Sequence, residues 1–476
     1  MKEYLRLAEI QEDLSEGVIS CVELVGHYLH QIESQKHLNA FVEVYDQEAK
    51  ASAERIDAKI RSGTAGKLAG LVLGIKDVLS WKDHAVQAGS QILNSYIAPF
   101  TATAVQRLID EDAIIIGRQN CDEFAMGSSN ENSSFGAVLN AKDTQKVPGG
   151  SSGGSAVAVQ AGMCHASLGT DTGGSVRQPA AFCGVVGLKP SYGRVSRWGL
   201  IAYASSFDCI GPLTKSVADA AVILEVMAGA DEYDSTASSE AVPSYSQLLE
   251  PKPNQKIGYI QEMIDNPALD PAIRASTMAA IEQLKGRGHI VEPVTLPSIS
   301  HLLPTYYILT TAEASSNLAR FDGVRYGHRS KLATDLESLY KKSRTEGFGE
   351  EVRRRILLGT FVLSANYYDA YYTKAQSVRR MVRTETEALF EDYDFFLSPV
   401  TPTTAFKLGE KTNDPMQMYL ADVFTVHANV VGFPAISVPA GADAQGMPIG
   451  VQVMAPYLKE AELLAFSDEL QALMNA

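Results

Sequence analysis

Two serine- and glycine-rich segments and one lysine have the residue types needed to cleave an amide bond. The segments are PGGSSGGSA at 148–156 and GTDTGGSVRQPA at 169–180, and Lys76 ends the apolar run LVLGIKD at 71–77. A lysine that burial keeps near neutrality can take the proton of a serine hydroxyl and so activate that serine. Consecutive backbone N–H groups in glycine turns can converge on the resulting oxyanion. These features favour hydrolysis by a serine nucleophile with a lysine base.

Other roles for the first segment fit its residues less well. A flexible linker would not need the apolar stretches that follow, AVAVQAG at 156–162 and VVGLKP at 185–190. A Walker-type phosphate loop requires Lys-Ser or Lys-Thr directly after its last glycine, where Ser155 and Ala156 stand here. A dinucleotide fingerprint is also absent, because GGSSGG has serine where the middle glycine should be.

Histidine is a poor candidate for the catalytic base. The nine histidines lie in no catalytic motif, and most isolated histidines are surface or structural residues. Taken alone, a lysine in the position of Lys76 would more often be a solvated surface residue or an ion-pair partner of Asp77 than a catalytic base. The two serine segments favour the catalytic interpretation of this lysine.

The combination of GIKD at 74–77, PGGSSGGSA at 148–156 and GTDTGGSVRQPAAFCGVVGLKP at 169–190 resembles the amidase signature family. The resemblance implies that Ser175 is the nucleophile, that Ser151 bridges to it after a cis peptide bond, and that Lys76 is the base. Ser152 either steadies the lysine amine or serves only in a turn. The oxyanion is then expected to bind the backbone N–H groups of Thr172, Gly173, Gly174 and Ser175.

Further stretches resemble one branch of this family, the glutaminase (A) subunits of amidotransferases acting on Glu-tRNA(Gln) or Asp-tRNA(Asn). They include NCDEFAMGSSNENSSFGAVLN at 120–140 and EVRRRILLGTFVLSANYYDAYY at 351–372. The resemblance implies that the chain hydrolyses glutamine and supplies ammonia to the B subunit, which uses ATP and Mg²⁺ to amidate the mischarged tRNA. A small C subunit would hold A and B together, and this chain would need no metal or organic cofactor.

Two alternatives to this function remain. One is a stand-alone amidase for other small or hydrophobic amides, and the other is a catalytically silent scaffold. Intact Lys76, Ser151 and Ser175 argue against the scaffold.

Free glutamine is a zwitterion, so its pocket should contain a guanidinium for the carboxylate and a carboxylate for the ammonium. Arg355 and Asp422 match the residues that perform these tasks in the branch, and Tyr306 matches a pocket tyrosine. Arg355 belongs to a run of three arginines and Tyr306 precedes Tyr307, so each assignment can shift by one residue. Without the resemblance, the arginine run would be interpreted as a solvated helix face.

Composition indicates a folded globular protein. The 476 residues are 45% hydrophobic, and a net charge of −15 argues against a general surface for polyphosphates, so tRNA should be held mainly by a partner. The five cysteines are scattered without a CxxC pair, which argues against a disulfide framework or a zinc site. No signal peptide is visible, and no run approaches the ~18 apolar residues of a membrane span. The expected location is the cytoplasm.

Alternating strand and helix patterns predict an α/β fold with a central mixed β-sheet flanked by α-helices. Strands are expected at 71–75, 113–117, 256–260, 289–294 and 393–399, with a closing hairpin of 435–441 and 449–455. Helices are expected over about 21–37, 46–61, 101–112, 271–285 and 350–392, with one more at the end of the chain.

We expect a single amidase-signature domain over residues 1–476. Its N-terminal helical segment should cover about 1–65 and its signature core about 70–215. The part from about 250 to 476 should complete the sheet and the glutamine pocket.

Overall fold

The computed structural model describes residues 1–412 and 414–475, so residues 413 and 476 of the predicted domain lie outside the described part. Its strands are β1 (Phe41–Val44), β2 (Val72–Lys76), β3 (Ile114–Gln119), β4 (Ala166–Asp171), β5 (Val186–Lys189), β6 (Cys209–Thr214), β7 (Lys256–Ile260), β8 (Ile290–Val294), β9 (Phe395–Pro399), β10 (Ala435–Ala442) and β11 (Pro448–Met454). They form one sheet in the order β1-β3-β2-β4-β6-β5-β10-β11-β9-β7-β8.

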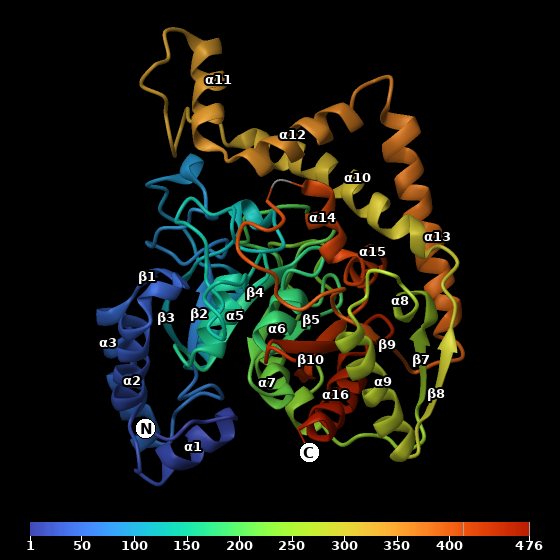
Figure 1. Cartoon of the computed structure of the whole chain (residues 1–476). Helices are drawn as coiled ribbons and strands as arrows, with labels where there is room; N and C mark the ends of the chain where they lie inside the picture. Colours follow the sequence, from blue (N-terminus) through green and yellow to red (C-terminus); the bar gives the residue numbers. More distant parts are fainter. Residues whose placement is uncertain (413, 476) are drawn as a thin grey trace.

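The helices surround this sheet, as Figure 1 shows. They are α1 (Leu7–Ser15), α2 (Cys21–Ser34), α3 (Asp46–Ser62), α4 (Thr103–Asp110), α5 (Gly153–Gln160), α6 (Arg177–Cys183), α7 (Val217–Met227), α8 (Gln261–Ile264), α9 (Pro271–Gly286), α10 (Ile299–Asn317), α11 (Leu336–Gly347), α12 (Glu350–Val362), α13 (Lys374–Leu389), α14 (Pro415–Tyr419), α15 (Val426–Val431) and α16 (Glu460–Met474). The arrangement confirms the predicted α/β class with a central mixed sheet.

Strand β2 lies in the parallel part of the sheet, between β3 and β4. All five of its residues are buried, as expected for a parallel strand covered on both faces. Because β2 ends at Lys76, its apolar residues place a lysine amine inside the protein. Strands β10 and β11 form the predicted antiparallel hairpin.

The predicted helix over 350–392 is wrong as one continuous element. Helix α12 ends at Val362 and α13 begins at Lys374, with a turn and a short π-helix at Asp369–Thr373 between them. The connecting segment SANYYDAYYT consists mainly of Ser, Asn, Asp, Thr and Tyr, which favour a helix interior less than Ala or Leu do.

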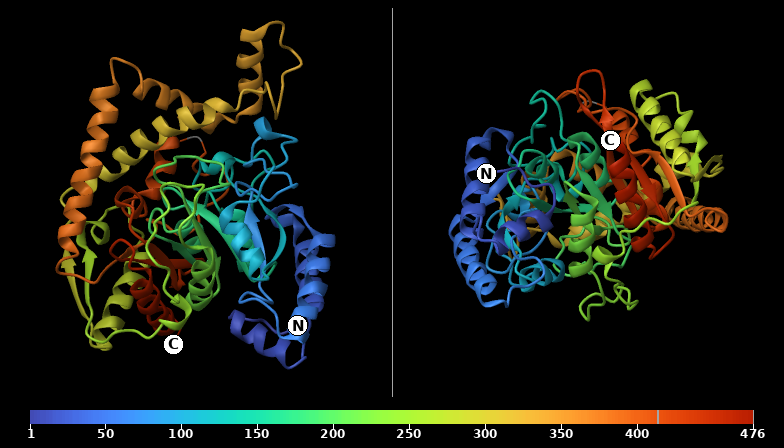
Figure 2. Two further views of the ribbon diagram at one scale, coloured as in Figure 1. Left: turned by 180° about the vertical axis from the view of Figure 1, so that it is seen from behind. Right: turned by 90° about the horizontal axis from the view of Figure 1, so that it is seen from below.

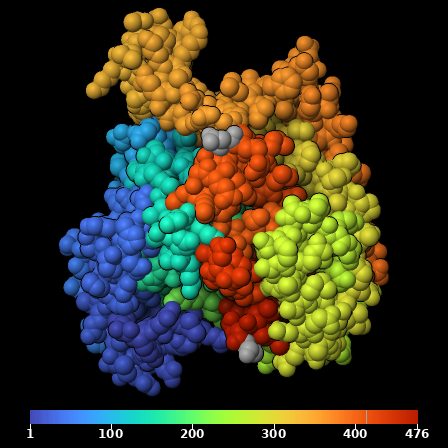
Figure 3. All heavy atoms as spheres, viewed as in Figure 1, coloured from blue at the N-terminus to red at the C-terminus, as the bar shows by residue number. Residues whose placement is uncertain are grey.

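Helices α10, α12 and α13 form an arch over one end of the sheet, and α11 projects from this arch (Figures 1 and 2). The space-filling view shows α11 standing clear of the main body (Figure 3). Helix α12 packs closely on α10. Arg355 belongs to α12, so the arch can bring its side chain toward the core.

Two further expectations concern cysteines and membranes. All five cysteines are buried and unpaired, as their scatter along the chain predicted. Within residues 1–412 and 414–475, every helix is too short or too polar to cross a bilayer.

Candidate active site

Lys76 is fully buried and is held by three hydroxyl groups. Its Nζ lies 2.7 Å from Ser151 Oγ, 2.9 Å from Ser152 Oγ and 2.9 Å from Thr170 Oγ1. Burial lowers the pKa of this amine to about 8. A base whose pKa lies close to the working pH is well suited to accept and return a proton. Of the two roles open to Ser152, the structure therefore supports contact with the lysine amine.

Ser151 follows a cis peptide bond between Gly150 and Ser151, as the family resemblance implied. Both ends of this peptide are anchored. The Gly150 N–H donates to Gln178 Oε1 at 2.8 Å, and the Ser151 carbonyl accepts from the Asp122 N–H at 3.1 Å. The surrounding fold thereby aims the Ser151 hydroxyl at Lys76.

Ser175 lies in the loop between β4 and α6 and is 8% exposed. Its carbonyl accepts a hydrogen bond of 3.1 Å from the Ser152 N–H, which joins the two serine segments through their backbones. Among the hydrogen bonds of the described residues, none connects the hydroxyls of Ser151 and Ser175. The transfer of a proton between these two hydroxyls stays a prediction.

The loop before Ser175 presents several backbone N–H groups, but one of them already has an acceptor. The Gly174 N–H donates to Asp171 Oδ1 at 2.9 Å, so this carboxylate engages it in the present geometry, and its binding to the oxyanion stays a prediction. Asp171 is also paired with Arg177 at 3.0 Å; burial alone would raise the pKa of this carboxyl, but the guanidinium lowers it to about 2. An ionised Asp171 therefore holds the loop in shape.

Three N–H groups of the loop remain available to an oxyanion. Within the described part of the chain, those of Thr172, Gly173 and Ser175 donate to no protein acceptor. Gly173 must be glycine because a Cβ there would collide with the ring of Tyr306. Predicted pocket residue Tyr306, which is 3% exposed, therefore lies directly against this loop.

The three arginines at 353–355 have different environments. Arg353 is exposed, and Arg354 pairs at the surface with Glu350. Arg355 is only 3% exposed, and its guanidinium lies 2.7 Å from Glu351 and 2.9 Å from Tyr203 Oη. Arg355 is thus the arginine of the run that faces the interior.

Aromatic rings surround the Arg355 guanidinium on several sides. The rings of Tyr203, Tyr307 and Tyr419 have their centroids 5.6, 5.4 and 5.4 Å from it. Such rings stabilise a cation while leaving N–H groups free to bind a carboxylate.

Asp422 shares Tyr307 with this cation, because the Tyr307 ring lies against the guanidinium and the Tyr307 hydroxyl donates to the carboxylate. It accepts hydrogen bonds of 2.9 Å from Ser128 Oγ and 3.1 Å from Tyr307 Oη, and burial raises its pKa to about 7. A ligand ammonium would stabilise the ionised carboxylate. The rings of Tyr306 and Tyr307 meet edge to face, 5.0 Å apart, so Tyr306 contacts the loop while Tyr307 holds Asp422. Both tyrosines of the pair therefore take part in the site.

Several residues of the site have no signal in the sequence. Thr170 contacts the proposed base, Ser128 and Tyr307 donate to Asp422, and the Tyr203 hydroxyl contacts Arg355. Their partners lie between 94 and 294 residues away along the chain. Only the position of Tyr307 next to Tyr306 could have indicated one of them.

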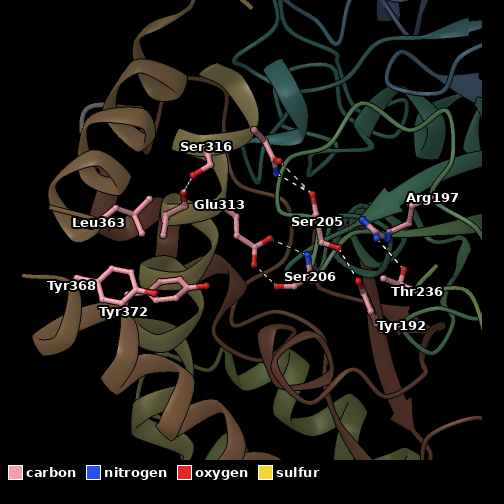
Figure 4. Close-up of a pocket in the computed structure, with 12 residues that line it drawn as sticks. Tyr192, Arg197, Ser205, Ser206, Thr236, Glu313, Ser316, Leu363, Tyr368 and Tyr372 are labelled. Atoms are coloured by element: carbon pink, nitrogen blue, oxygen red, sulfur yellow. Dashed lines mark hydrogen bonds between the residues drawn. The ribbon is translucent and has the colours of Figure 1, made fainter. Parts of the chain in front are cut away.

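A cavity of about 460 Å³ lies beside this site and contains none of its predicted residues. Figure 4 shows its polar lining, with Ser205 and Ser206 on one side and Glu313 on the other. The Tyr203 carbonyl, just before these serines, accepts from Asn317 at the cavity wall.

Comparisons with known proteins show which sequences and structures this chain is similar to. The family model described as Amidase matches residues 23–464. The A subunit of the glutamyl-tRNA(Gln) amidotransferase of Koribacter versatilis is 51% identical over 466 residues, covering 97% of each chain. The protein of the same name from Chlorobium chlorochromatii is 50% identical over 97% of this chain and 98% of its own.

A solved structure shows the same likeness. The A subunit of the glutamyl-tRNA(Gln) amidotransferase of Thermotoga maritima superposes with a TM-score of 0.77 and 39% sequence identity. The match covers 93% of this chain and 89% of that one.

Proposed function

This chain belongs to the amidase family, and from that premise we propose that it is the glutaminase subunit of a tRNA-dependent amidotransferase. The observation that carries the proposal is the buried Lys76 amine against Ser151, beside a pocket with charges of both signs. The lysine and serines fit amide hydrolysis. Arg355 and Asp422 fit the carboxylate and ammonium of free glutamine.

The proposed reaction begins when Ser175 Oγ attacks the side-chain amide carbon of glutamine. The Ser175 proton passes to Ser151, and the Ser151 proton passes to neutral Lys76. The oxyanion binds the N–H groups of Thr172, Gly173 and Ser175. The C–N bond then breaks, ammonia leaves with the proton returned from Lys76, and a γ-glutamyl ester remains on Ser175. Water hydrolyses this ester to glutamate and regenerates the serine.

The names of the relatives describe them as one of several amidotransferase subunits, which supports partner subunits for this chain. We assign the phosphorylation and amidation of mischarged tRNA to the B subunit with ATP and Mg²⁺, and the joining of A and B to the C subunit. In the proposed mechanism this chain uses only side chains and backbone groups. A cytoplasmic location and a single domain complete the proposal, and the acceptor is Glu-tRNA(Gln) or Asp-tRNA(Asn).

The function is tested by measuring ammonia release by the chain assembled with its partner subunits. We expect kcat/KM for glutamine to exceed that for an apolar amide of similar size by at least about 100-fold, because only glutamine satisfies both buried charges. Preference for the apolar amide would instead identify a stand-alone amidase. Failure of any amide or activated phosphonate to react at Ser175 would identify a scaffold.

The arginine run provides a matched test of the pocket. Arg355→Gln should raise the KM for glutamine by about 10- to 100-fold, since a hydrogen-bonded charge pair is lost. Arg353→Gln removes the same charge from the exposed face of the same helix and should leave KM within about twofold. Steady-state kinetics measure the KM for glutamine of both variants. Equal KM values for the two variants would contradict the assignment of Arg355.

A further inference from the structure

Asp208 hydrogen-bonds both the loop of the proposed oxyanion donors and the backbone of Tyr203, whose side chain contacts Arg355. It belongs to neither of the two serine- and glycine-rich segments. Its carboxylate is 3% exposed and lies just before β6. Strands β4 and β6 are antiparallel and pair Asp171 with Cys209, so the next facing pair is Thr172 with Asp208. The register of the sheet therefore places Asp208 opposite the first residue of the oxyanion loop.

The Asp208 carboxylate accepts hydrogen bonds from both the oxyanion loop and the segment at 203–204. One oxygen accepts the Thr172 hydroxyl at 2.7 Å, and the other accepts the Tyr203 N–H at 3.0 Å. The Ala204 N–H adds contacts of 3.2 and 3.1 Å to the two oxygens. Thr172 begins the loop of oxyanion donors, whereas Tyr203 Oη contacts the Arg355 guanidinium.

The side chain of Tyr203 is fixed by its own contacts, so the position of its backbone also sets the position of its hydroxyl against Arg355. Its side chain is 1% exposed, and its Oη also donates to Thr310 Oγ1 at 3.0 Å. The segment that follows, with Ser205 and Ser206, borders the cavity of Figure 4 and contacts Glu313 there. Asp208 therefore links the backbone at 203–204 to Thr172, in the loop that precedes Ser175.

We propose that Asp208 is a positioning residue that keeps the oxyanion loop and the carboxylate-binding arginine in register, so that the glutamine amide meets Ser175 when its carboxylate is bound. The inference rests on the proposed function. Misplacing a reacting group by about 1 Å can cost about 100-fold in rate, which makes such an anchor effective. Burial raises the pKa of Asp208 to about 6, so the carboxyl is ionised at neutral pH and accepts from all three donor groups.

The inference predicts a characteristic division between kcat and KM. Asp208→Ala should lower kcat for glutamine by about 10- to 100-fold through Thr172 and raise KM by about 5- to 10-fold through Tyr203 and Arg355. Thr172→Val keeps the backbone N–H but loses the hydroxyl, and should lower kcat alone. Because both changes break the same contact, the double variant should have the kcat of Asp208→Ala. Asp208→Asn retains an acceptor and should recover part of both losses.

These variants are measured in the assembled enzyme, with Asp219→Ala as the control. Asp219 is equally buried but accepts from the Leu7 N–H and His165, on the side of α7, so its loss should change thermal stability without changing kcat or KM. Additive kcat losses in the double variant, or an unchanged KM in Asp208→Ala, would overturn the inference. If Asp208→Ala does not fold, a wild-type kcat for Thr172→Val overturns it equally. Lack of glutamine hydrolysis by the wild type would instead refute the proposed function.

Discussion

Replacing Ser175 with alanine is expected to abolish glutamine hydrolysis, with kcat falling by about 10⁴-fold or more, because no other group can form the acyl intermediate. The assembled enzyme should still amidate tRNA when free ammonium is supplied, since that step takes place in the partner. The measurement compares glutamine-dependent with ammonium-dependent formation of amidated tRNA.

Ser155→Ala is a suitable control for the Ser175 variant. Ser155 belongs to the same glycine-rich region and is fully buried, but its hydroxyl donates to the Leu168 carbonyl and, among the described residues, hydrogen-bonds no member of the proposed relay. It should keep glutamine-dependent activity. Glutamine-dependent activity that survives in Ser175→Ala would show that the nucleophile lies elsewhere.

The second large effect concerns the base. Lys76→Met should lower the rate of acyl transfer by about 10³- to 10⁴-fold, since it removes the proton acceptor while filling the same space. Lys189→Met is the matched control: Lys189 is equally buried, burial also lowers its pKa, and within residues 1–412 and 414–475 its Nζ hydrogen-bonds only the Pro190 carbonyl. Activity should depend on the lysine at 76 and not on the one at 189.

The pH dependence of the wild type follows from the same amine. Lys76 accepts a proton only when it is neutral, and burial brings its pKa to about 8. The value of kcat/KM should therefore rise with pH through about 8 and fall as the pH drops below it. An activated ester without amino or carboxylate groups is the appropriate substrate, because its binding does not depend on Asp422. The inflection should be absent in Lys76→Met and present in Lys189→Met.

The proposed reacting groups could be named from the sequence because each belongs to a short segment that carries the resemblance to the amidase signature family. Lys76 ends a fully apolar strand, and Ser151 and Ser175 lie in glycine-rich turns that precede helices. Local periodicity likewise located β7 and α9, and Ser20 with Glu23 forms the capping box that begins α2. Such features depend on neighbouring residues and are visible without a structure.

The sequence did not show contacts that depend on how the chain is folded, whether their partners are near or far apart along it. The acceptor of the Gly174 N–H depends on how the loop closes over Asp171, and nothing in GTDTGGS indicates it. Helix α10 was not predicted because it contains Pro304 and buries residues on several sides, which weakens a 3.6-residue pattern. The roles of Ser128 and Tyr203 depend on partners 294 and 152 residues away.

The central claim is that Lys76 activates Ser175 through Ser151. Rapid quenching of the assembled enzyme with glutamine, followed by mass spectrometry of its peptides, tests it most directly. The wild type should carry a γ-glutamyl ester on Ser175 within the first turnover. In Ser151→Ala and Lys76→Met the same ester should form at least about 100-fold more slowly. An ester on another residue, or formation at the wild-type rate in Ser151→Ala, would contradict the relay.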